Sequence, residues 1–368
     1  MSDLHLFFPE NDLALARDLE RYTAPPAAVR LRRSGEALPL WFGADGDRFV
    51  ASGINAAWLD GIKDLFGMDI DVFDYCVEKY RPAPWGWSKA SRTVFRRLGF
   101  ADSVLPDDKC LDAMRRLSHR RTASEIARRL HEATGIGLPA REIVVADELK
   151  SFLDRYPRAI VKQPWSSSGR GMVAVEAATF EAQRTMVEGM IRRQGSIMAE
   201  PHYRKTLDFA MLFNMDRGRC LPAGLSVFDT AGLGVYTGNI LAPEPGLRAM
   251  ICEKAGEKQF DAVAKALPAI LEDMIGDAYC GPLGIDMMAV EDADAPLVPV
   301  VEMNLRKTMG HLCARFYDRY VANGAHGHFG ISEMRIDDTA DVFNGRLRGG
   351  HLNLVPPGSG FSFAVDLL

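Results

Sequence analysis

The chain lacks the features that mark several large classes of protein. Its six cysteines are scattered over 368 residues without a CxxC pair, which argues against both a disulfide framework and a zinc site. Lysine and arginine (44) do not outnumber aspartate and glutamate (49), which argues against a nucleic-acid partner. No segment approaches the roughly 18 uninterrupted apolar residues of a membrane span. We therefore expect a reduced, cytoplasmic protein that binds neither nucleic acid nor membrane.

Two kinds of short signal are also missing. The first residues carry an acid at Asp3, no basic region, and an apolar run that stops at Pro9, so they do not resemble a signal peptide. The GxSxG nucleophile motif does not occur, and no Ser/His/Asp or Cys/His arrangement stands out. The sequence gives no reason to expect catalysis by a side-chain nucleophile.

What is present is the composition of an ordinary globular protein, with 47% apolar and 25% charged residues. This length predicts two or three domains. Alternating patterns predict a small N-terminal α/β domain up to residue 106, with strands at 4–8 and 38–42 and helices at about 12–20, 56–66 and 88–98.

The rest of the chain predicts a mixed α/β (α+β) arrangement. We expect one Arg-rich helical segment over 107–131, with a capping box from Thr122 to Glu125. Further helices are expected near 180–193, 257–275 and 309–320. Strands are expected near 142–145, 158–164, 172–176, 196–200, 209–215, 221–228, 284–290 and 297–304. The Gly- and His-rich tail after residue 323 has no clear pattern.

Polar residues interrupt the last two strands. Alternation places Glu302, Asn304 and Arg306 on one side of the final strand, while its partner strand holds Asp286 between apolar residues. Acids on strands built for burial need a compensating positive charge, and carboxylate and amide oxygens suit Mg²⁺. The alternative is that these acids lie on an edge strand and face water.

A Ser/Gly loop follows the strand that ends near Lys162. Glycines allow consecutive backbone N–H groups to point into one concavity, which suits phosphate. The loop is neither GxxxxGK[ST] nor a GxGxxG that opens a helix, because a strand follows it. A lysine among apolar neighbours stays charged when an anion is close. The alternatives are an ordinary flexible hairpin and a lysine whose ammonium reaches water at a strand end.

Together, the strand lysine, the Gly-rich hairpin, the Asp strand and the Glu-x-Asn strand resemble the ATP-grasp superfamily over about 107–322. The phrase Val-Glu-Met-Asn-Leu-Arg at 301–306 is similar to the E-x-N-x-R strand of biotin carboxylases and carbamoyl-phosphate synthetases. The resemblance implies a pre-ATP-grasp domain (1–106), two lobes with antiparallel sheets and flanking helices (107–195 and 196–323) and a C-terminal extension (324–368).

The resemblance also assigns roles to residues. It implies that Lys162 contacts the α- and β-phosphates of ATP. The loop that covers the phosphates would be Ser166, Ser167, Ser168, Gly169, Arg170 and Gly171. The adenine hinge would be Glu200, Pro201 and His202, and the ribose ligand would be Asp208. The Mg²⁺ ligands would be Asp286, Glu302 and Asn304, with Arg306 beside the transferred phosphoryl group.

One departure from the family pattern is visible. The usual first lysine is replaced within Ser118-His119-Arg120-Arg121. Arg120 is the expected substitute, because a guanidinium can bind phosphate through two hydrogen bonds. Arg121 is the alternative, and its other interpretation is a solvated helix face.

The implied activity is an ADP-forming, Mg²⁺-dependent ligase. It would join a small carboxylate to a small amine through an acyl phosphate, with Lys162 and Arg306 as catalytic residues. Two Mg²⁺ ions are expected, with Mn²⁺ as the substitute metal, and a homodimer is expected only by analogy. The alternatives are a kinase of a small polyol, a carboxylase, and a non-catalytic ATP-binding protein.

The substrates themselves are not readable from these patterns. Two segments are candidates for lining the substrate cleft: Pro84-Trp-Gly-Trp-Ser88 and Gly234-Val-Tyr-Thr-Gly-Asn239. Their alternative interpretations are tryptophans buried at a domain junction and a polar turn. His326 and His328 are too close in sequence, and lack an evident third ligand, to be a favoured metal pair.

Overall fold

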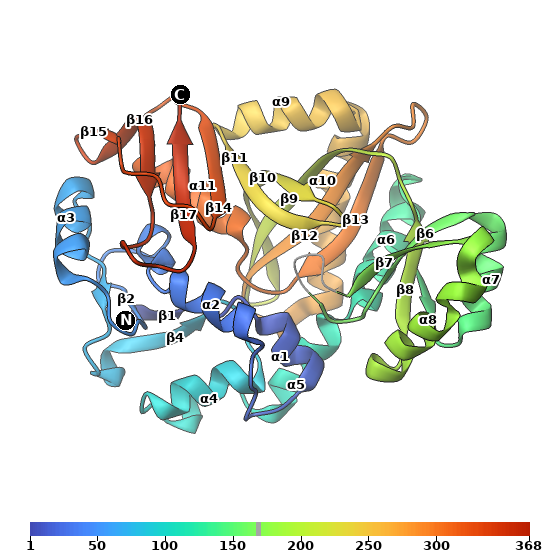
Figure 1. Cartoon of the computed structure of the whole chain (residues 1–368), viewed down its shortest axis with the longest axis horizontal. Helices are drawn as coiled ribbons and strands as arrows, with labels where there is room; N and C mark the ends of the chain where they lie inside the picture. Colours follow the sequence, from blue (N-terminus) through green and yellow to red (C-terminus); the bar gives the residue numbers. More distant parts are fainter. Residues whose placement is uncertain (167–170) are drawn as a thin grey trace.

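The computed structural model describes residues 1–166 and 171–368. It is a mixed α/β structure built on three sheets (Figure 1). The N-terminal sheet is parallel, with strand order β3-β2-β1-β4. Its strands are β1 (Ser2–Leu6), β2 (Arg48–Phe49), β3 (Asp71–Val72) and β4 (Tyr80–Pro84), and its helices are α1 (Asn11–Arg17), α2 (Pro26–Ser34), α3 (Ala56–Phe66) and α4 (Lys89–Arg97).

Three predictions for this half of the chain are wrong. Residues 38–42 do not form a strand: Leu38–Trp41 is a 3₁₀ helix with all four residues buried. Pro39 suits the first turn of such a helix and removes a donor that a strand would need. The helical segment over 107–131 is broken into α5 (Asp108–Leu117) and α6 (Arg120–Thr134). His119 caps α6 by accepting from the Arg121 N–H, so Thr122 lies inside the helix and forms no capping box.

A second, antiparallel sheet forms a compact lobe at one end of the molecule (Figure 1). We call it lobe 1. Its strand order is β5-β8-β6-β7, and its core is separate from the others. The elements are β5 (Arg141–Ile143), α7 (Ala146–Arg155), β6 (Arg158–Lys162), β7 (Met172–Glu176), α8 (Phe180–Gln194) and β8 (Ile197–Pro201).

The third sheet has nine strands in the order β13-β12-β9-β10-β11-β14-β17-β16-β15. Its first part, lobe 2, contains β9 (Lys205–Asp216), β10 (Arg219–Ala231), β11 (Val235–Leu241), β12 (Gly281–Val290) and β13 (Leu297–Asn304), with helices α9 (Glu244–Ala255), α10 (Glu257–Ile275) and α11 (Met309–Tyr320). The tail that sequence patterns could not place supplies β14 (Gly327–Ser332), β15 (Asp341–Phe343), β16 (Arg346–Asn353) and β17 (Ser362–Leu367). It extends the lobe 2 sheet, because β14 pairs with β11.

Packing joins the tail to the N-terminal domain. One hydrophobic cluster contains Leu4 and Trp41 from the N-terminal part, Phe316 from α11, and Phe363 and Val365 from β17. A different cluster fills the space between the lobe 2 sheet and helices α6, α9 and α10. None of the helices in the described part of the chain is long and apolar enough to span a bilayer.

Candidate active site

A cavity of about 340 Å³ lies between the lobe 2 sheet and the N-terminal domain. The sheet contributes the cleft-facing residues Ala210, Ser226, Phe228, Thr230, Asp286, Glu302 and Asn304. Helices α1 and α2 and the segment after β4 contribute a mostly apolar opposite wall, namely Leu13, Ala28, Leu31 and Trp85. The cavity is therefore polar on the sheet side and largely apolar on the side of the N-terminal domain.

Strand alternation brings the predicted acids together. In the antiparallel pair β12–β13, Asp286 lies directly opposite Glu302, and both line the cavity with Asn304. Their neighbours Ile285 and Met303 point to the other face, into the core under the helices. The alternative interpretation is correct in that β13 is the edge strand of its sheet. It is wrong in that the two acids are partly buried and line a shared cavity.

Two partly buried carboxylates on directly opposite residues need a positive charge nearby. Asp286 accepts a hydrogen bond from Asn304 Nδ2 at 2.9 Å, and its burial, together with the charge of Glu302, raises the pKa of Asp286 to about 7. Glu302 accepts from Arg120 Nη2 at 2.8 Å. The other carboxylate oxygen of Asp286 and of Glu302, together with Asn304 Oδ1, which accepts from Arg306, form a set of hard ligand atoms, and such a set fits Mg²⁺.

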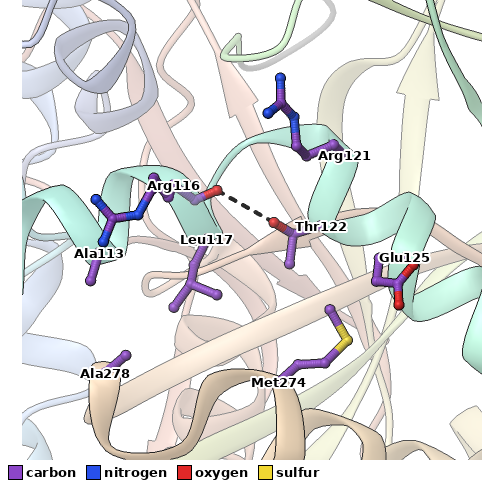
Figure 2. Close-up of a pocket in the computed structure, with 8 residues that line it drawn as sticks. All are labelled: Ala113, Arg116, Leu117, Arg121, Thr122, Glu125, Met274 and Ala278. Atoms are coloured by element: carbon purple, nitrogen blue, oxygen red, sulfur yellow. Dashed lines mark hydrogen bonds between the residues drawn. The ribbon is translucent and has the colours of Figure 1, made fainter.

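Arg120, rather than Arg121, faces the cleft. Its guanidinium is buried and also donates to Gln163 O at 2.6 Å and Ser166 Oγ at 2.8 Å, so it links lobe 2 to the strand-loop junction of lobe 1. Arg121 is exposed and pairs with Glu142. Arg121 borders a different hollow, which Leu117 and Met274 also line, and Figure 2 shows its side chain pointing away from these two.

Lys162 is 3% exposed, and its ammonium forms a buried ion pair with Glu200. The pair joins the antiparallel strands β6 and β8. Strand β8 ends at Pro201, and the His202 N–H donates to Arg158 O at 3.0 Å. The two charged side chains are thus held together on lobe 1, outside the residues that line the 340 Å³ cavity.

The remaining loop and ribose predictions have different outcomes. Ser167, Ser168, Gly169 and Arg170 lie outside the described residues, while Gly171 closes the hairpin through its carbonyl, which accepts from Gln163 N at 2.9 Å. Asp208 accepts from Thr230 Oγ1 at 2.6 Å and pairs with Lys205. Because Thr230 lines the cavity, Asp208 lies at its edge.

Arg306 has a partner that sequence reasoning missed. Its Nε and Nη2 donate to Asp12 Oδ2 at 3.0 and 2.8 Å, and Nη2 also donates to Asn304 Oδ1 at 2.8 Å. Packing here is close: a Cβ on Gly86 would lie 2.6 Å from Asn11 Nδ2 and 2.9 Å from Arg306 Cβ. The only sequence signal for this contact was the polar turn that follows the first strand.

Both segments singled out as substrate candidates line the cavity, the first through Trp85 and the second through Tyr236 and Asn239. The segment 234–239 is not a turn, since β11 begins at Val235. Tyr236 donates to Asn239 Oδ1 at 2.5 Å, and Asn239 Nδ2 donates to Ser226 Oγ at 2.7 Å. Burial raises the pKa of Tyr236, so its hydroxyl stays protonated. His328 pairs with Asp229 and, in the described residues, belongs to no cluster that could hold a metal.

The sequence matches no family model and no curated protein, but the structure has clear counterparts. Biotin carboxylase from Campylobacter jejuni, solved as a β,γ-ATP complex, aligns with a TM-score of 0.55 and 14% identity over 100% of this chain and 88% of its own. The biotin carboxylase domain of Hydrogenobacter thermophilus 2-oxoglutarate carboxylase, with MgADP and bicarbonate, gives 0.51 and 12% over 100% and 86%. N5-carboxyaminoimidazole ribonucleotide synthetase from Thermus thermophilus gives 0.50 and 16% over 99% and 93%. The chain has the ATP-grasp fold.

Proposed function

We propose that the chain is an ADP-forming, ATP-dependent ligase that joins a small carboxylate to an amine through an acyl phosphate. The observation that carries the proposal is the shared cavity of Asp286, Glu302 and Asn304, with Arg120, from the start of α6, bonded to Glu302. Oxygen ligands with a buried guanidinium directly beside them suit a metal-bound polyphosphate. If the Arg120–Glu302 ion pair had only a structural role, it would not need the further oxygen ligand atoms of Asp286 and Asn304 beside it.

In this proposal, Asp286, Glu302 and Asn304 would hold Mg²⁺, which would neutralise part of the negative charge of the phosphates. Lys162 and Arg120 contact the phosphates, for which Arg120 is already oriented by Ser166 and Gln163. Glu200 to His202 and Asp208 contact the nucleoside. Arg306 is held beside the metal ligands by Asp12 and Asn304, where its charge can stabilise an oxyanion during acyl transfer.

In this proposal, the cavity wall formed by the N-terminal domain holds the amine that accepts the acyl group, and we call it the acceptor wall. It comprises Leu13, Ala28, Leu31, Trp85 and Glu10. It is largely apolar, but Glu10 lies in it, 2% exposed. One carboxylate oxygen of Glu10 pairs with Arg32, and the other has no hydrogen-bond partner in the described residues. A buried acceptor atom without a partner is costly, and an ammonium group would satisfy it. We therefore expect an amine with an apolar body as one substrate.

A second candidate is carboxylation of an amine, with bicarbonate as the acid. Two of the structural counterparts are biotin carboxylases, and one was solved with bicarbonate. Both candidates use the same proposed Mg²⁺ ligands and the same wall for the amine, so the acid that supports turnover distinguishes them.

The decisive experiment measures ADP release from ATP and Mg²⁺ with pooled small carboxylates and pooled amines, followed by mass spectrometry of the products. We expect release only when an acid and an amine are both present, with a product lighter by one water than their sum. Release with bicarbonate as the only acid would support the carboxylase, and release with a polyol alone would support a kinase. Absence of release from every pool, in a protein that binds ADP, would overturn catalysis. Glu302→Gln serves as the inactive control.

A further inference from the structure

A second cavity, of about 310 Å³, lies in the N-terminal domain. Its lining includes Leu6, the last residue of β1, and the two phenylalanines that follow it. Val50, directly after β2, and Thr93 and Arg97 on α4 also line it. The cavity is therefore at the carboxyl ends of parallel strands, where ligands bind in open α/β sheets. Its volume falls in the range of small-molecule sites.

The ionisable side chains that line this second cavity are positive on balance, with Arg21, Arg32 and Arg97 against Glu20 and Glu36. Arg21 and Arg97 line it, and neither has a hydrogen-bond or ion-pair partner within residues 1–166 and 171–368. Of the two acids in the lining, Glu20 pairs with Arg92 and Arg96. Glu36 accepts hydrogen bonds from the backbone and hydroxyl of Ser52 and has no cationic partner in the described residues.

A third guanidinium separates the two cavities. Arg32 lines the second cavity, while its partner Glu10 lines the first. Arg32 also lies over the ring of Phe8, 5.6 Å from its centroid. Apolar side chains, including Phe8, Val50 and Val94, form the rest of the lining. The second cavity thus combines several guanidinium groups with an apolar floor.

We infer that the second cavity binds a small phosphate monoester that carries an apolar or aromatic body. Arg21 and Arg97 are exposed and have no partner in the described residues, so each guanidinium is available to bind phosphate through two hydrogen bonds. The apolar floor would accept the organic part of the ligand. This inference does not depend on the proposed ligase activity, because none of the residues it uses contacts the metal ligands.

Binding there has a consequence for the first cavity. A dianion beside Arg32 competes with Glu10 for the same guanidinium, so occupancy of the second cavity weakens the only ion pair of Glu10 in the described residues. The site is placed to act as an effector site whose ligand changes the charge on the acceptor wall.

The test is calorimetric titration of phenyl phosphate into the full chain, in the presence of saturating ADP and Mg²⁺ to block the nucleotide site. We expect one saturable site whose affinity falls about tenfold or more in Arg21→Gln and in Arg97→Gln. Arg33→Gln is the matched control, because Arg33 is exposed on the same helix as Arg32 and lines neither cavity. Circular dichroism shows whether each variant is folded, and Arg97→Lys, which keeps the charge, should retain part of the affinity.

Three results would overturn the inference. One is the absence of saturable binding to the unmodified chain. Another is an equal affinity in Arg21→Gln, Arg97→Gln and Arg33→Gln. The third is binding that disappears when ADP and Mg²⁺ are present but is unchanged in the arginine variants, because phenyl phosphate would then occupy the nucleotide site.

Discussion

Asp12 and Arg306 are 294 residues apart in sequence, yet one carboxylate oxygen of Asp12 accepts two hydrogen bonds from the Arg306 guanidinium. The chain of contacts continues from Arg306 to Asn304 and from Asn304 to Asp286. The N-terminal domain therefore orients the side chains at the end of the proposed metal strand, although it supplies no proposed metal ligand itself.

We expect Asp12→Asn to lower turnover about 10- to 100-fold, the usual range for partners that orient metal-site residues. The amide cannot balance the charge of Arg306, whose guanidinium would then reorient. ADP affinity should change little, because Asp12 is not among the residues proposed to contact the nucleotide. Steady-state kinetics and ADP titration measure both, with the exposed Asp64→Asn as control. Equal kinetics in Asp12→Asn and Asp64→Asn would contradict a positioning role.

Asp286→Asn and Glu302→Gln should each reduce Mg²⁺-dependent ATP turnover by about 100-fold or more, because each removes an anionic oxygen ligand from the proposed metal site. Both substitutions preserve shape, so the melting temperature should stay near that of the unmodified protein. The control is Asp294→Asn in the exposed turn between β12 and β13. Full turnover in a folded Glu302→Gln protein would refute the metal site.

Lys162→Met should destabilise the protein by about 3–5 kcal/mol, because it leaves Glu200 buried without its partner. The double variant Lys162→Met, Glu200→Gln should recover most of this loss in chemical denaturation. Turnover should remain absent in both variants if Lys162 contacts phosphate. Recovery of turnover together with stability in the double variant would show that the pair is only structural.

Stability should fall on acidification through the titration of His311. Burial, together with the charges of Lys307 and Arg306, lowers the pKa of His311 to about 4. The unfolded chain therefore binds a proton near pH 6.5 that the folded chain does not. The contribution of His311 to the free energy of unfolding is therefore highest above pH 6.5. It falls by about 1–3 kcal/mol as the pH drops from 6.5 towards 4.

His311→Gln is the informative variant for that pH dependence. His311 accepts from the Thr308 N–H in the capping box that begins α11, and glutamine can take the same role. Urea unfolding between pH 4 and 7 should show a smaller pH dependence in the variant than in the unmodified protein. An unchanged slope would assign the effect to other groups.

Local pattern was enough to predict much of the fold. Helices at 56–66, 257–275 and 309–320 match α3, α10 and α11, because their apolar spacing is regular. The failures involve tertiary context. The strand predicted at 38–42 became a buried 3₁₀ turn, and α9 was missed because its apolar residues do not gather on one face.

The candidate site was likewise predicted where local pattern determines it and missed where tertiary contacts do. Alternation along two adjacent strands was sufficient to bring Asp286, Glu302 and Asn304 into one cavity. Asp12 and Glu10 could not be found, because their contacts join segments that only the assembled fold brings together. The pairing of Lys162 with Glu200 also depends on the register of β6 against β8, which short motifs do not encode.

The mixed hydrophobic cluster of the N-terminal sheet, α11 and β17 has a mechanical consequence. The same parts are also joined through the sheet, because β11 of lobe 2 pairs with β14 of the tail, whereas lobe 1 keeps its own interior. In the proposed ligase, the acceptor wall and the oxygen ligands of β12 and β13 would therefore keep a fixed spacing, and lobe 1 would be the part that tilts over the bound nucleotide.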